Sequence, residues 1–358
     1  MRVLQILPTI SFGDGVSNDC IAIKSILEKN GYTTAIYAEN IDQRLSESNI
    51  YCIKKLPKLY KDDIILYHLS TGTSLNRMIL ELNGKKIIRY HNITPPEFFE
   101  SYSASLNNLC QKGYDEAKEI AQRSCYLLAD SEYNRKEMIR MGYKGDSKVA
   151  PILIPFDDYK KAASDKVLSQ YCNFSGHNIV FVGRLAPNKK QERIIEIFNY
   201  YQKYYDPNAR LFLVGSGNGM EIYETQLKQY AKILKLKNVC FTGHIKFDEI
   251  LAYYQLADTF VCMSEHEGFC IPLVEAMYFN KPIVALNTSA IGETLGGSGI
   301  LFETYRPLEI AGMIHKLNTD SILRDSVIRN QQERLIGFST ETVAKIILEY
   351  IQKVEKDK

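Results

Sequence analysis

The chain has 358 residues, of which 45% are hydrophobic and 24% charged; this ordinary globular composition excludes a collagen-like or wholly disordered protein. Its 44 basic and 42 acidic residues give a net charge of +2, far from the basic excess of a dedicated nucleic-acid binder, so we expect no nucleic-acid partner. At roughly 100 to 200 residues per domain, the length predicts two domains, or at most three.

The first half alternates short β-branched runs with helical patterns, which is typical of a parallel sheet covered by helices on both faces. Strands are predicted at residues 3–8, 33–38, 64–69, 86–90, 125–129 and 149–154. Helices are predicted between them, at residues 17–30, 75–82, 106–123 and 132–141.

The second half repeats this plan and closes on an amphipathic pattern at residues 341–354. Strands are predicted at residues 179–183, 211–215, 239–243, 260–264 and 283–286, and helices at 191–205, 221–236, 247–257 and 272–279. Residues 155–176 are polar and rich in turn residues, so we expect a boundary near residue 170. The sequence thus predicts an α/β protein with doubly wound units at 1–170 and 171–339.

Eight cysteines are scattered without any C-x-x-C pair, a pattern that favours reduced thiols in the core of a cytosolic protein. No signal-peptide core and no apolar run of membrane-spanning length is present, so we expect a soluble, cytoplasmic chain. Lys54, Lys55, Lys58 and Lys61 form a local basic patch. Such a patch is either a solvated face or a contact with an anionic membrane surface.

Ligands of open parallel sheets bind beyond the carboxyl ends of the strands, so the loops there are the places to search. Gly13 and Gly15 follow the first strand, with Ser17 as the expected helix cap; this is either a phosphate-binding loop or a plain tight turn. Arg184 and Lys189 follow the first strand of the second unit. They could clamp a diphosphate, or they could be surface charges.

Three further loops carry polar signals. Residues 215–219, Gly-Ser-Gly-Asn-Gly, lack the full G-x-G-x-x-G spacing, so a packing turn explains them better than a nicotinamide site. His91 and Asn92 follow a strand, where the histidine could bind a substrate hydroxyl or serve a structural role. Glu267 and Glu275 flank a predicted helix start, where carboxylates can accept hydrogen bonds from a vicinal diol.

In order along the chain, these blocks resemble the retaining glycosyltransferases of family 4, of the bacterial envelope-polysaccharide type. The resemblance is carried by Val182-Gly-Arg-Leu, Lys189, Leu213-Val-Gly-Ser-Gly, Phe241-Thr-Gly and Glu267-Gly-Phe-x-x-Pro-x-x-Glu275-Ala-Met. It implies the GT-B fold, in which two Rossmann-like, doubly wound parallel-sheet domains face each other. It also implies that a terminal helix, residues 340–358 here, crosses back onto the first domain.

The resemblance implies a role for each matched residue. The loop with Gly13 and Gly15 would meet the donor diphosphate, and Arg184 with Lys189 would neutralise the departing nucleoside diphosphate. The sugar hydroxyls would be held by Glu267 and by the N–H groups of Gly268, Phe269, Cys270 and Ile271.

The remaining roles concern the nucleoside and the transferred sugar. Glu275 would hold the ribose diol, and backbone groups near Gly243 and Ile245 would read the base. His91 would lie against the transferred sugar. No D-x-D motif occurs, so we expect no metal and no other cofactor.

The sequence departs from the family pattern at a few positions. Asn92 stands where Asp is frequent, Lys190 and Cys270 where Gly is usual, and residues 289–292 read Ser-Ala-Ile-Gly instead of containing a double glycine.

The predicted activity is the transfer of a hexose from a UDP- or GDP-sugar to a hydroxyl of a glycan or lipid-linked glycan, with retention of configuration. The family type suggests lipopolysaccharide, O-antigen or capsule synthesis at the inner face of the membrane, with residues 54–61 toward the acceptor. A nucleotide-sugar epimerase or hydrolase, or a non-catalytic sugar-nucleotide-binding subunit, remains an alternative.

Overall fold

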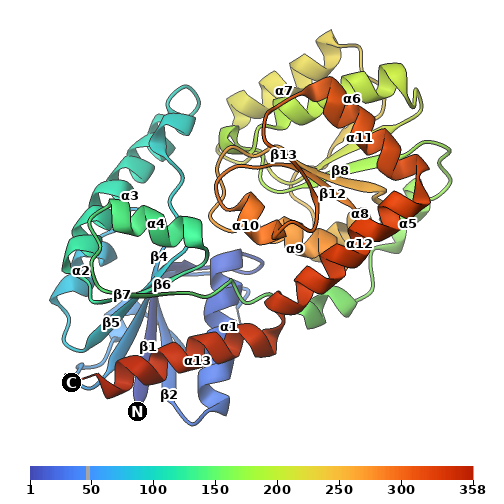
Figure 1. Ribbon diagram of the computed structural model, residues 1–358. Coiled ribbons are helices and arrows are strands. Elements are labelled where there is room, and N and C mark those ends of the chain that lie inside the picture. Colours follow the sequence, from blue (N-terminus) through green and yellow to red (C-terminus); the bar gives the residue numbers. More distant parts are fainter. Residues whose placement is uncertain (46–48, 358) are drawn as a thin grey trace. The chain divides into compact units, whose positions relative to one another are not determined.

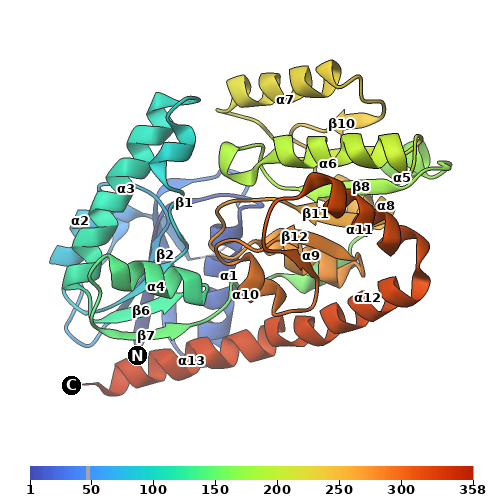
Figure 2. The ribbon, with the colours of Figure 1, turned by 45° about the horizontal axis from the view of Figure 1, so that its top comes forward.

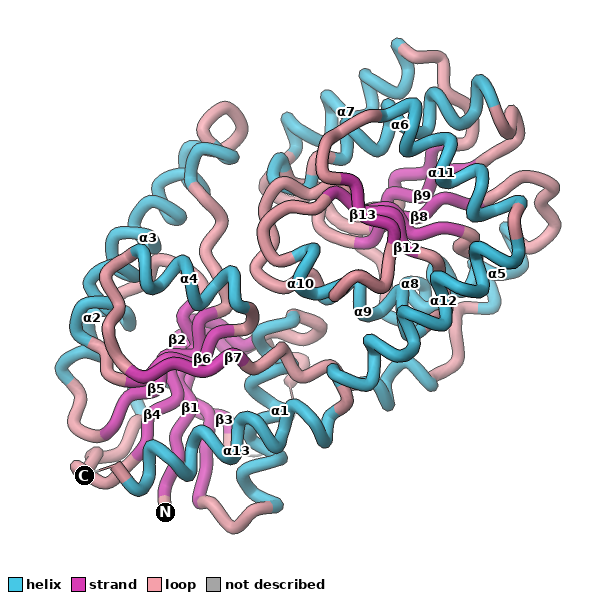
Figure 3. The backbone as a smooth tube through the Cα atoms, viewed as in Figure 1, coloured by secondary structure: helices cyan, strands magenta, loops and turns pink. Residues whose placement is uncertain are grey.

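The computed structural model describes residues 1–45 and 49–357, which divide into two α/β units (Figure 1). Unit 1 comprises Met1–Glu97, Ser105–Pro155 and Gly337–Lys358, and unit 2 comprises Phe98–Ala104 and Phe156–Ile336. Each unit has its own parallel sheet, as the separate groups of magenta strands in Figure 3 show.

The change of unit comes at Pro155, earlier than the expected boundary at residue 170. The polar stretch after Pro155 contains a helix, and its aromatic side chains pack in unit 2: the Tyr159 ring lies 5.9 Å from that of Phe247, and the Tyr171 ring 5.0 Å from that of Phe212. The polar composition of the segment indicated a boundary within it, because the few aromatic residues that make these contacts follow no periodic pattern in the sequence.

Unit 1 has a seven-stranded sheet in the order β3-β2-β1-β4-β5-β6-β7. Its strands are β1 Arg2–Ile10, β2 Thr33–Ile41, β3 Ile50–Cys52, β4 Ile64–Leu69, β5 Lys85–Tyr90, β6 Tyr126–Ala129 and β7 Asp146–Val149. Its helices are α1 Gly15–Lys29, α2 Leu75–Glu81, α3 Ala104–Arg123, α4 Glu132–Arg140 and α13 Thr340–Lys356.

The central strands of unit 1 are buried on both faces, since all six residues of β4 are buried. One face packs under α2 and α3, and the other under α1 and α13 (Figure 2). The apolar side of α13, with Val343, Ile347 and Ile351, belongs to the same core cluster as Ile23 of α1. The last residue of the expected terminal helix, Lys358, lies outside the described residues.

Two predictions for unit 1 differ from the structure. The predicted strand at 149–154 is wrong: β7 ends at Val149, and the apolar residues after it form irregular chain, because Pro151 has no N–H to give to a sheet. Strand β3 was not predicted, since three residues carry too little pattern. Both β3 and β7 lie at the edges of the sheet, where burial is weakest.

Unit 2 has a six-stranded sheet in the order β10-β9-β8-β11-β12-β13. Its strands are β8 Asn178–Val182, β9 Arg210–Val214, β10 Val239–Phe241, β11 Thr259–Cys262, β12 Ile283–Leu286 and β13 Ile300–Phe302. Its helices are α5 Asp165–Tyr171, α6 Gln191–Tyr204, α7 Glu221–Ile233, α8 Phe247–Leu256, α9 Ile271–Tyr278, α10 Ile291–Leu295, α11 Pro307–Thr319 and α12 Ser321–Leu335. The series therefore continues beyond β12, where the prediction had closed it.

Candidate active site

The carboxyl ends of the unit 2 strands carry most of the predicted site residues. Strands β8 and β11 are neighbours, although the chain runs from β8 outward to β9 and β10 before it returns to β11. Open α/β sheets bind their ligands at such a reversal of strand order. Lys189 follows β8 and Glu267 follows β11, so the two residues flank the reversal.

Lys189 and Glu267 form an ion pair, with Nζ of the lysine 2.5 Å from Oε2 of the glutamate. The glutamate side chain is 8% exposed and the lysine side chain 23%. Burial alone would lower the pKa of Lys189, but the adjacent Glu267 carboxylate outweighs burial and raises that pKa. The lysine is therefore charged at neutral pH, and the pairing itself is a feature that the sequence did not predict.

Side chains from a neighbouring loop and helix hold the backbone of the loop after β11. The N–H of Glu267 donates to Oγ of Ser289 at 2.8 Å, and the Thr294 hydroxyl donates to the carbonyl of Phe269 at 2.6 Å. Ser289 lies in the segment that departs from the family pattern. Its hydroxyl fixes the residue predicted to hold the sugar.

Cys270 is the residue before α9 and has a left-handed backbone, with φ of 71°. This conformation suits glycine, which is the residue the family usually has there. The Sγ atoms of Cys270 and Cys262 and a carboxylate oxygen of Glu267 lie within 4.8 Å of one another. A hydrogen bond with Cys262 and burial together raise the pKa of the Cys270 thiol, so this thiol stays protonated beside the ion pair.

Glu275 lies one turn into α9, and both of its carboxylate oxygens accept hydrogen bonds from tyrosines. The Tyr159 hydroxyl donates to Oε1 at 2.8 Å, and the Tyr254 hydroxyl donates to Oε2 at 2.6 Å. Burial raises the pKa of Glu275, while the two hydroxyl donors oppose that shift. Each oxygen keeps a second lone pair that can accept from a ligand hydroxyl. Neither tyrosine was predicted from the sequence.

Arg184 occupies an exposed position on the same edge of the sheet, and its Nη2 donates to the carbonyl of Asn218 at 3.1 Å. The structure thus brings Lys189 together with Glu267, whereas Arg184 is held by the loop after β9.

The loops after β8, β9 and β10 pack tightly against one another. A Cβ on Gly215 would lie 2.1 Å from the carbonyl oxygen of Gly183, so only glycine fits there. Gly215 also forms an isolated antiparallel bridge with Gly243, which places the Gly243–Ile245 loop beside the other two. Ile245 itself is half-buried.

In unit 1, the turn after β1 begins α1 at Gly15, and Gly13 has a left-handed backbone with φ of 76°. The expected cap, Ser17, is wrong. Asp14 is the N-cap and accepts the N–H of Ser17 at 3.0 Å, because the capping carboxylate must precede the first helical residue. The helix start therefore already carries an acidic group.

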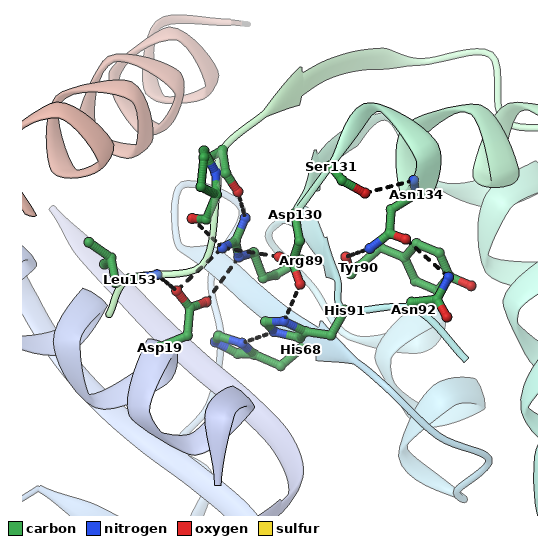
Figure 4. Close-up of polar contacts among 12 residues, drawn as sticks. Asp19, His68, Arg89, Tyr90, His91, Asn92, Asp130, Ser131, Asn134 and Leu153 are labelled. Atoms are coloured by element: carbon green, nitrogen blue, oxygen red, sulfur yellow. Dashed lines mark hydrogen bonds and ion pairs between the residues drawn. The ribbon is translucent and has the colours of Figure 1, made fainter. Parts of the chain in front are cut away.

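His91 lies just beyond β5, and both of its ring nitrogens contact other side chains of unit 1 (Figure 4). Nδ1 lies 2.9 Å from Oδ2 of Asp130, and Nε2 lies 2.8 Å from Nδ1 of His68. The His91 side chain is 1% exposed. His68 sits within the apolar strand β4, where neither periodicity nor spacing marked it.

Asn92 has a left-handed backbone with φ of 76°, which asparagine tolerates well. Its Nδ2 donates to Oδ1 of Asn134 at 3.0 Å and to Oε2 of Glu137 at 2.9 Å. An amide can donate to a carboxylate here, whereas the Asp frequent in the family could not without a proton.

Sequence comparison connects this geometry to a family. Residues 175–334 match the family described as glycosyl transferases group 1. These residues lie within unit 2, so the match to this glycosyltransferase family covers the unit that carries Lys189, Glu267 and Glu275.

Two curated relatives are similar to this chain. It is 32% identical to the mannosylfructose-phosphate synthase of Agrobacterium fabrum over 165 residues, which cover 44% of this chain and 34% of the relative. It is 24% identical to the alpha-monoglucosyldiacylglycerol synthase of Acholeplasma laidlawii over 326 residues, which cover 85% of this chain and 79% of the relative. The chain thus matches about a third of the first relative's length.

Solved structures show the GT-B fold over the whole glycosyltransferase. Sucrose-phosphate synthase from Thermosynechococcus elongatus aligns with a TM-score of 0.77 at 15% identity, covering 99% of both chains. Anabaena Alr3699/HepE in complex with UDP-glucose aligns with a TM-score of 0.75 at 18% identity, covering 99% of this chain and 100% of that one.

The basic patch lies near the amino ends of two strands of unit 1. The carbonyl of Lys58 accepts from Arg2, the first residue of β1, and the segment leads back to the start of β4. Lys58 and Lys61 therefore lie at the amino ends of the strands, opposite the edge at which parallel sheets bind ligands. The expectation that residues 54–61 face the acceptor stays a prediction.

Among the described residues, no helix of the glycosyltransferase is long and apolar enough to cross a membrane. At the carboxyl edge of the unit 2 sheet, its cations can stabilise a departing anion, and its carboxylates can accept hydrogen bonds from hydroxyls. This combination suits a ligand with both a phosphate and a polyol part.

Proposed function

We propose that this glycosyltransferase transfers a hexose from a UDP- or GDP-sugar to a hydroxyl of a glycan or lipid-linked glycan, with retention of the anomeric configuration. The observation that carries the proposal is the grouping of Lys189, Glu267 and Glu275 on the loop and helix starts at the carboxyl edge of the unit 2 sheet. Solved structures of the same fold with UDP and UDP-glucose bound support the donor class.

In this proposal, Lys189 and Arg184 neutralise the leaving diphosphate, and Glu267 orients the sugar hydroxyls. The bond from the anomeric carbon to the diphosphate oxygen breaks, and its electron pair stays on that oxygen. The acceptor oxygen bonds to the anomeric carbon on the same face, and its proton passes to the departing phosphate. Preorganised cations serve this step because negative charge develops on the leaving group. No divalent metal is required if the two side chains supply that charge.

The acceptor belongs to envelope-glycan synthesis in this proposal. An O-antigen chain mannosyltransferase B of Escherichia coli is 25% identical over 179 residues, and the Acholeplasma relative is named for a diacylglycerol product. Both names fit an acceptor at or near a membrane surface, and a peripheral location at its inner face follows from that acceptor.

The first test is nucleotide release from a panel of UDP- and GDP-hexoses, with EDTA present, with and without lipid-linked and free glycan acceptors. We expect one donor to be consumed only when an acceptor is added, and NMR of the product to show the donor's anomeric configuration. Consumption without acceptor would indicate an epimerase or hydrolase instead. Binding without any turnover under all conditions would indicate a non-catalytic subunit.

Nucleotide binding gives a second test with a matched control. A ligand at about 100 times its Kd stabilises a protein by roughly 2.7 kcal/mol. We expect UDP or GDP to raise the unfolding temperature of the wild type and of Glu137→Gln, but not of Glu275→Gln. Glu137 is a suitable control because it is also a buried carboxylate that accepts from two tyrosine hydroxyls, of Tyr90 and Tyr114, but it lies in unit 1. Equal stabilisation of both variants would contradict the ribose role of Glu275.

A further inference from the structure

A continuous chain of hydrogen bonds runs through the interior of unit 1 from α1 to the end of β6. Gln5 Nε2 donates to the carbonyl of Cys20 at 2.9 Å, and Gln5 Oε1 lies 2.9 Å from Nε2 of His68. His68 Nδ1 then lies 2.8 Å from Nε2 of His91, whose Nδ1 lies 2.9 Å from Oδ2 of Asp130 (Figure 4). We call these four contacts the histidine chain.

The histidine chain needs one proton more than its neutral members can supply. Both of its ends are acceptors, since one end is a carbonyl oxygen and the other a carboxylate. A glutamine amide and a neutral imidazole each donate on one side and accept on the other, so a row of such groups can satisfy only one acceptor end. Each of the four contacts needs one donor, but neutral Gln5, His68 and His91 supply only three. In one contact, two acceptors would then face each other at 2.9 Å or less. One member must therefore donate on both sides.

The orientation of Gln5 fixes the direction of the first half of the chain. Its Nε2 must face the carbonyl of Cys20, so its Oε1 accepts from Nε2 of His68. Burial, assisted by the positive charge of nearby Arg89, lowers the pKa of His68 well below its usual value. His68 is therefore neutral, its Nδ1 accepts, and Nε2 of His91 must donate.

The second half of the chain depends on the state of Asp130. Its Oδ1 lies 3.1 Å from Nη2 of Arg89, a guanidinium that is always charged, and this pairing favours the ionised carboxylate. An ionised Asp130 only accepts, so Nδ1 of His91 also carries a proton. His91 is then the member that donates on both sides.

Charge balance likewise calls for one protonated ring in this cluster. The charged groups that face the histidine chain from the elements packed around it are Asp19 on α1, Arg89 on β5 and Asp130 after β6. All three side chains are fully buried, and together they carry one positive and two negative charges. Buried charges are costly unless they are compensated. A protonated His91 makes the cluster neutral.

We propose that His68 is a positioning residue that, with Asp130, holds the ring of His91 as a buried imidazolium at neutral pH. This rests on the proposed function and deepens the prediction that His91 lies against the transferred sugar. A ring with both nitrogens donating cannot act as a general base, and its edges are fixed by His68 and Asp130. What the ring offers a neighbouring ligand is a fixed positive charge.

The spacing of the rings fits a shared proton better than a metal ion, although Asp19, His68 and His91 bring ligand-type atoms close together. A tetrahedral zinc ion with two nitrogen ligands at about 2.0–2.1 Å would hold those nitrogens roughly 3.3 Å apart. The facing ring nitrogens of His68 and His91 are 2.8 Å apart, which is a hydrogen-bond distance.

The test is long-range proton–nitrogen NMR of the ligand-free full chain with ¹⁵N-labelled histidine, at about pH 8, where a histidine with the ordinary pKa of about 6.5 is neutral. An imidazolium shows two similar nitrogen shifts, and a neutral ring shows two widely separated ones. The chain has six histidines, so assignment by single substitution is practical. We expect His91 to be the imidazolium and His68 to be a neutral ring protonated on Nε2.

Two variants, one at each end of the histidine chain, sharpen this test. Asp130→Asn places an amide where Nδ2 can donate to His91 and Oδ1 can accept from Arg89, so every contact is satisfied with two neutral rings. Gln5→Leu removes the constraint on His68, which can then donate to His91 while His91 donates to Asp130. We expect the imidazolium signature to be lost in both variants. It should persist in His177→Gln, which removes a partly exposed histidine that also contacts an aspartate.

The outcomes separate cleanly. A neutral His91 in the wild type, or an imidazolium that survives in a folded Asp130→Asn variant, would overturn the proposal. Circular dichroism establishes whether each variant is folded. If one of Asp130→Asn and Gln5→Leu does not fold, the other is sufficient for the test. Once turnover is measured, wild-type kcat should fall as the pH rises through the loss of this proton, and Asp130→Asn should lack that limb of the profile. The NMR result needs no substrate, so it stands apart from any failure of the proposed transfer reaction.

Discussion

Removing either tyrosine hydroxyl from Glu275 should make nucleotide binding more sensitive to acid. Tyr159 and Tyr254 each donate to one carboxylate oxygen, and these hydrogen bonds oppose the rise in the pKa of Glu275 that burial causes. A hydrogen bond to a charged group contributes roughly 1.5–3 kcal/mol, and one pKa unit corresponds to about 1.4 kcal/mol. Tyr159→Phe or Tyr254→Phe should therefore raise the pKa of Glu275 further.

The sign of the effect follows from the state that binds. Glu275 can accept from both hydroxyls of a ribose diol only as a carboxylate, so affinity is present above its pKa and lost as the pH falls through it. A higher pKa moves this loss to higher pH. The free energy of unfolding changes in the same variants without any ligand: a carboxyl group whose pKa is raised by folding loses stability as the pH rises toward that pKa. At neutral pH, we expect a loss of roughly 1.5–3 kcal/mol.

The assay is isothermal titration of UDP and GDP across a pH series, with urea unfolding in parallel. Tyr278→Phe is the matched control. The Tyr278 ring lies 5.3 Å from that of Tyr159 in the same aromatic cluster, but the hydroxyls that donate to Glu275 belong to Tyr159 and Tyr254. The reasoning fails if the midpoint for nucleotide binding moves no further in Tyr159→Phe and Tyr254→Phe than in Tyr278→Phe.

Two further predictions concern the scaffold, and urea denaturation measures both. Gly215→Ala should lower the free energy of unfolding by more than about 3 kcal/mol, because its Cβ would overlap the Gly183 carbonyl. The new Cβ of Gly243→Ala would meet only open space, so we expect this variant to lose only the about 1–2 kcal/mol that a left-handed backbone costs. Equal losses would contradict the packing of these loops. Ile347→Ala, in the apolar side of α13, should cost about 2–5 kcal/mol, and Lys345→Ala on the exposed side less than about 0.5 kcal/mol. A comparable loss in both would refute the docking of α13 in unit 1.

Helices and strands with a long apolar pattern, on one face or throughout, could be predicted from the sequence. Elements whose position depends on a few contacts were missed. Strand β4 and helix α13 carry clear apolar patterns and were predicted close to their observed limits. Strand β7 is a short edge strand of sequence Asp-Ser-Lys-Val, so the apolar residues that follow it drew the prediction away. The N-cap of α1 was predicted three residues too late, because Asp14 and Ser17 are both good capping residues. In the structure Asp14 is the cap, and the Ser17 hydroxyl donates to its carboxylate.

For the site, the sequence predicted positions but not partners. Motif and topology placed Lys189 and Glu267 after neighbouring strands, yet their ion pair depends on side-chain directions that no spacing encodes. His68 was invisible because its neighbours in β4 are apolar, and a single polar residue there looks like a satisfied core histidine. That is what it is, but the groups that satisfy it are His91 and Gln5.

The two kinds of carboxylate at the edge of the unit 2 sheet differ in how they are held, and this difference bears on what each can bind. Glu267 is paired with a cation, so its negative charge is already compensated. Glu275 is held by neutral hydroxyl donors, which fix its geometry while leaving its negative charge intact. An uncompensated carboxylate repels a phosphate but strengthens hydrogen bonds from neutral hydroxyls. The proposed function therefore assigns the diphosphate to Lys189 and Arg184, and the diol to Glu275.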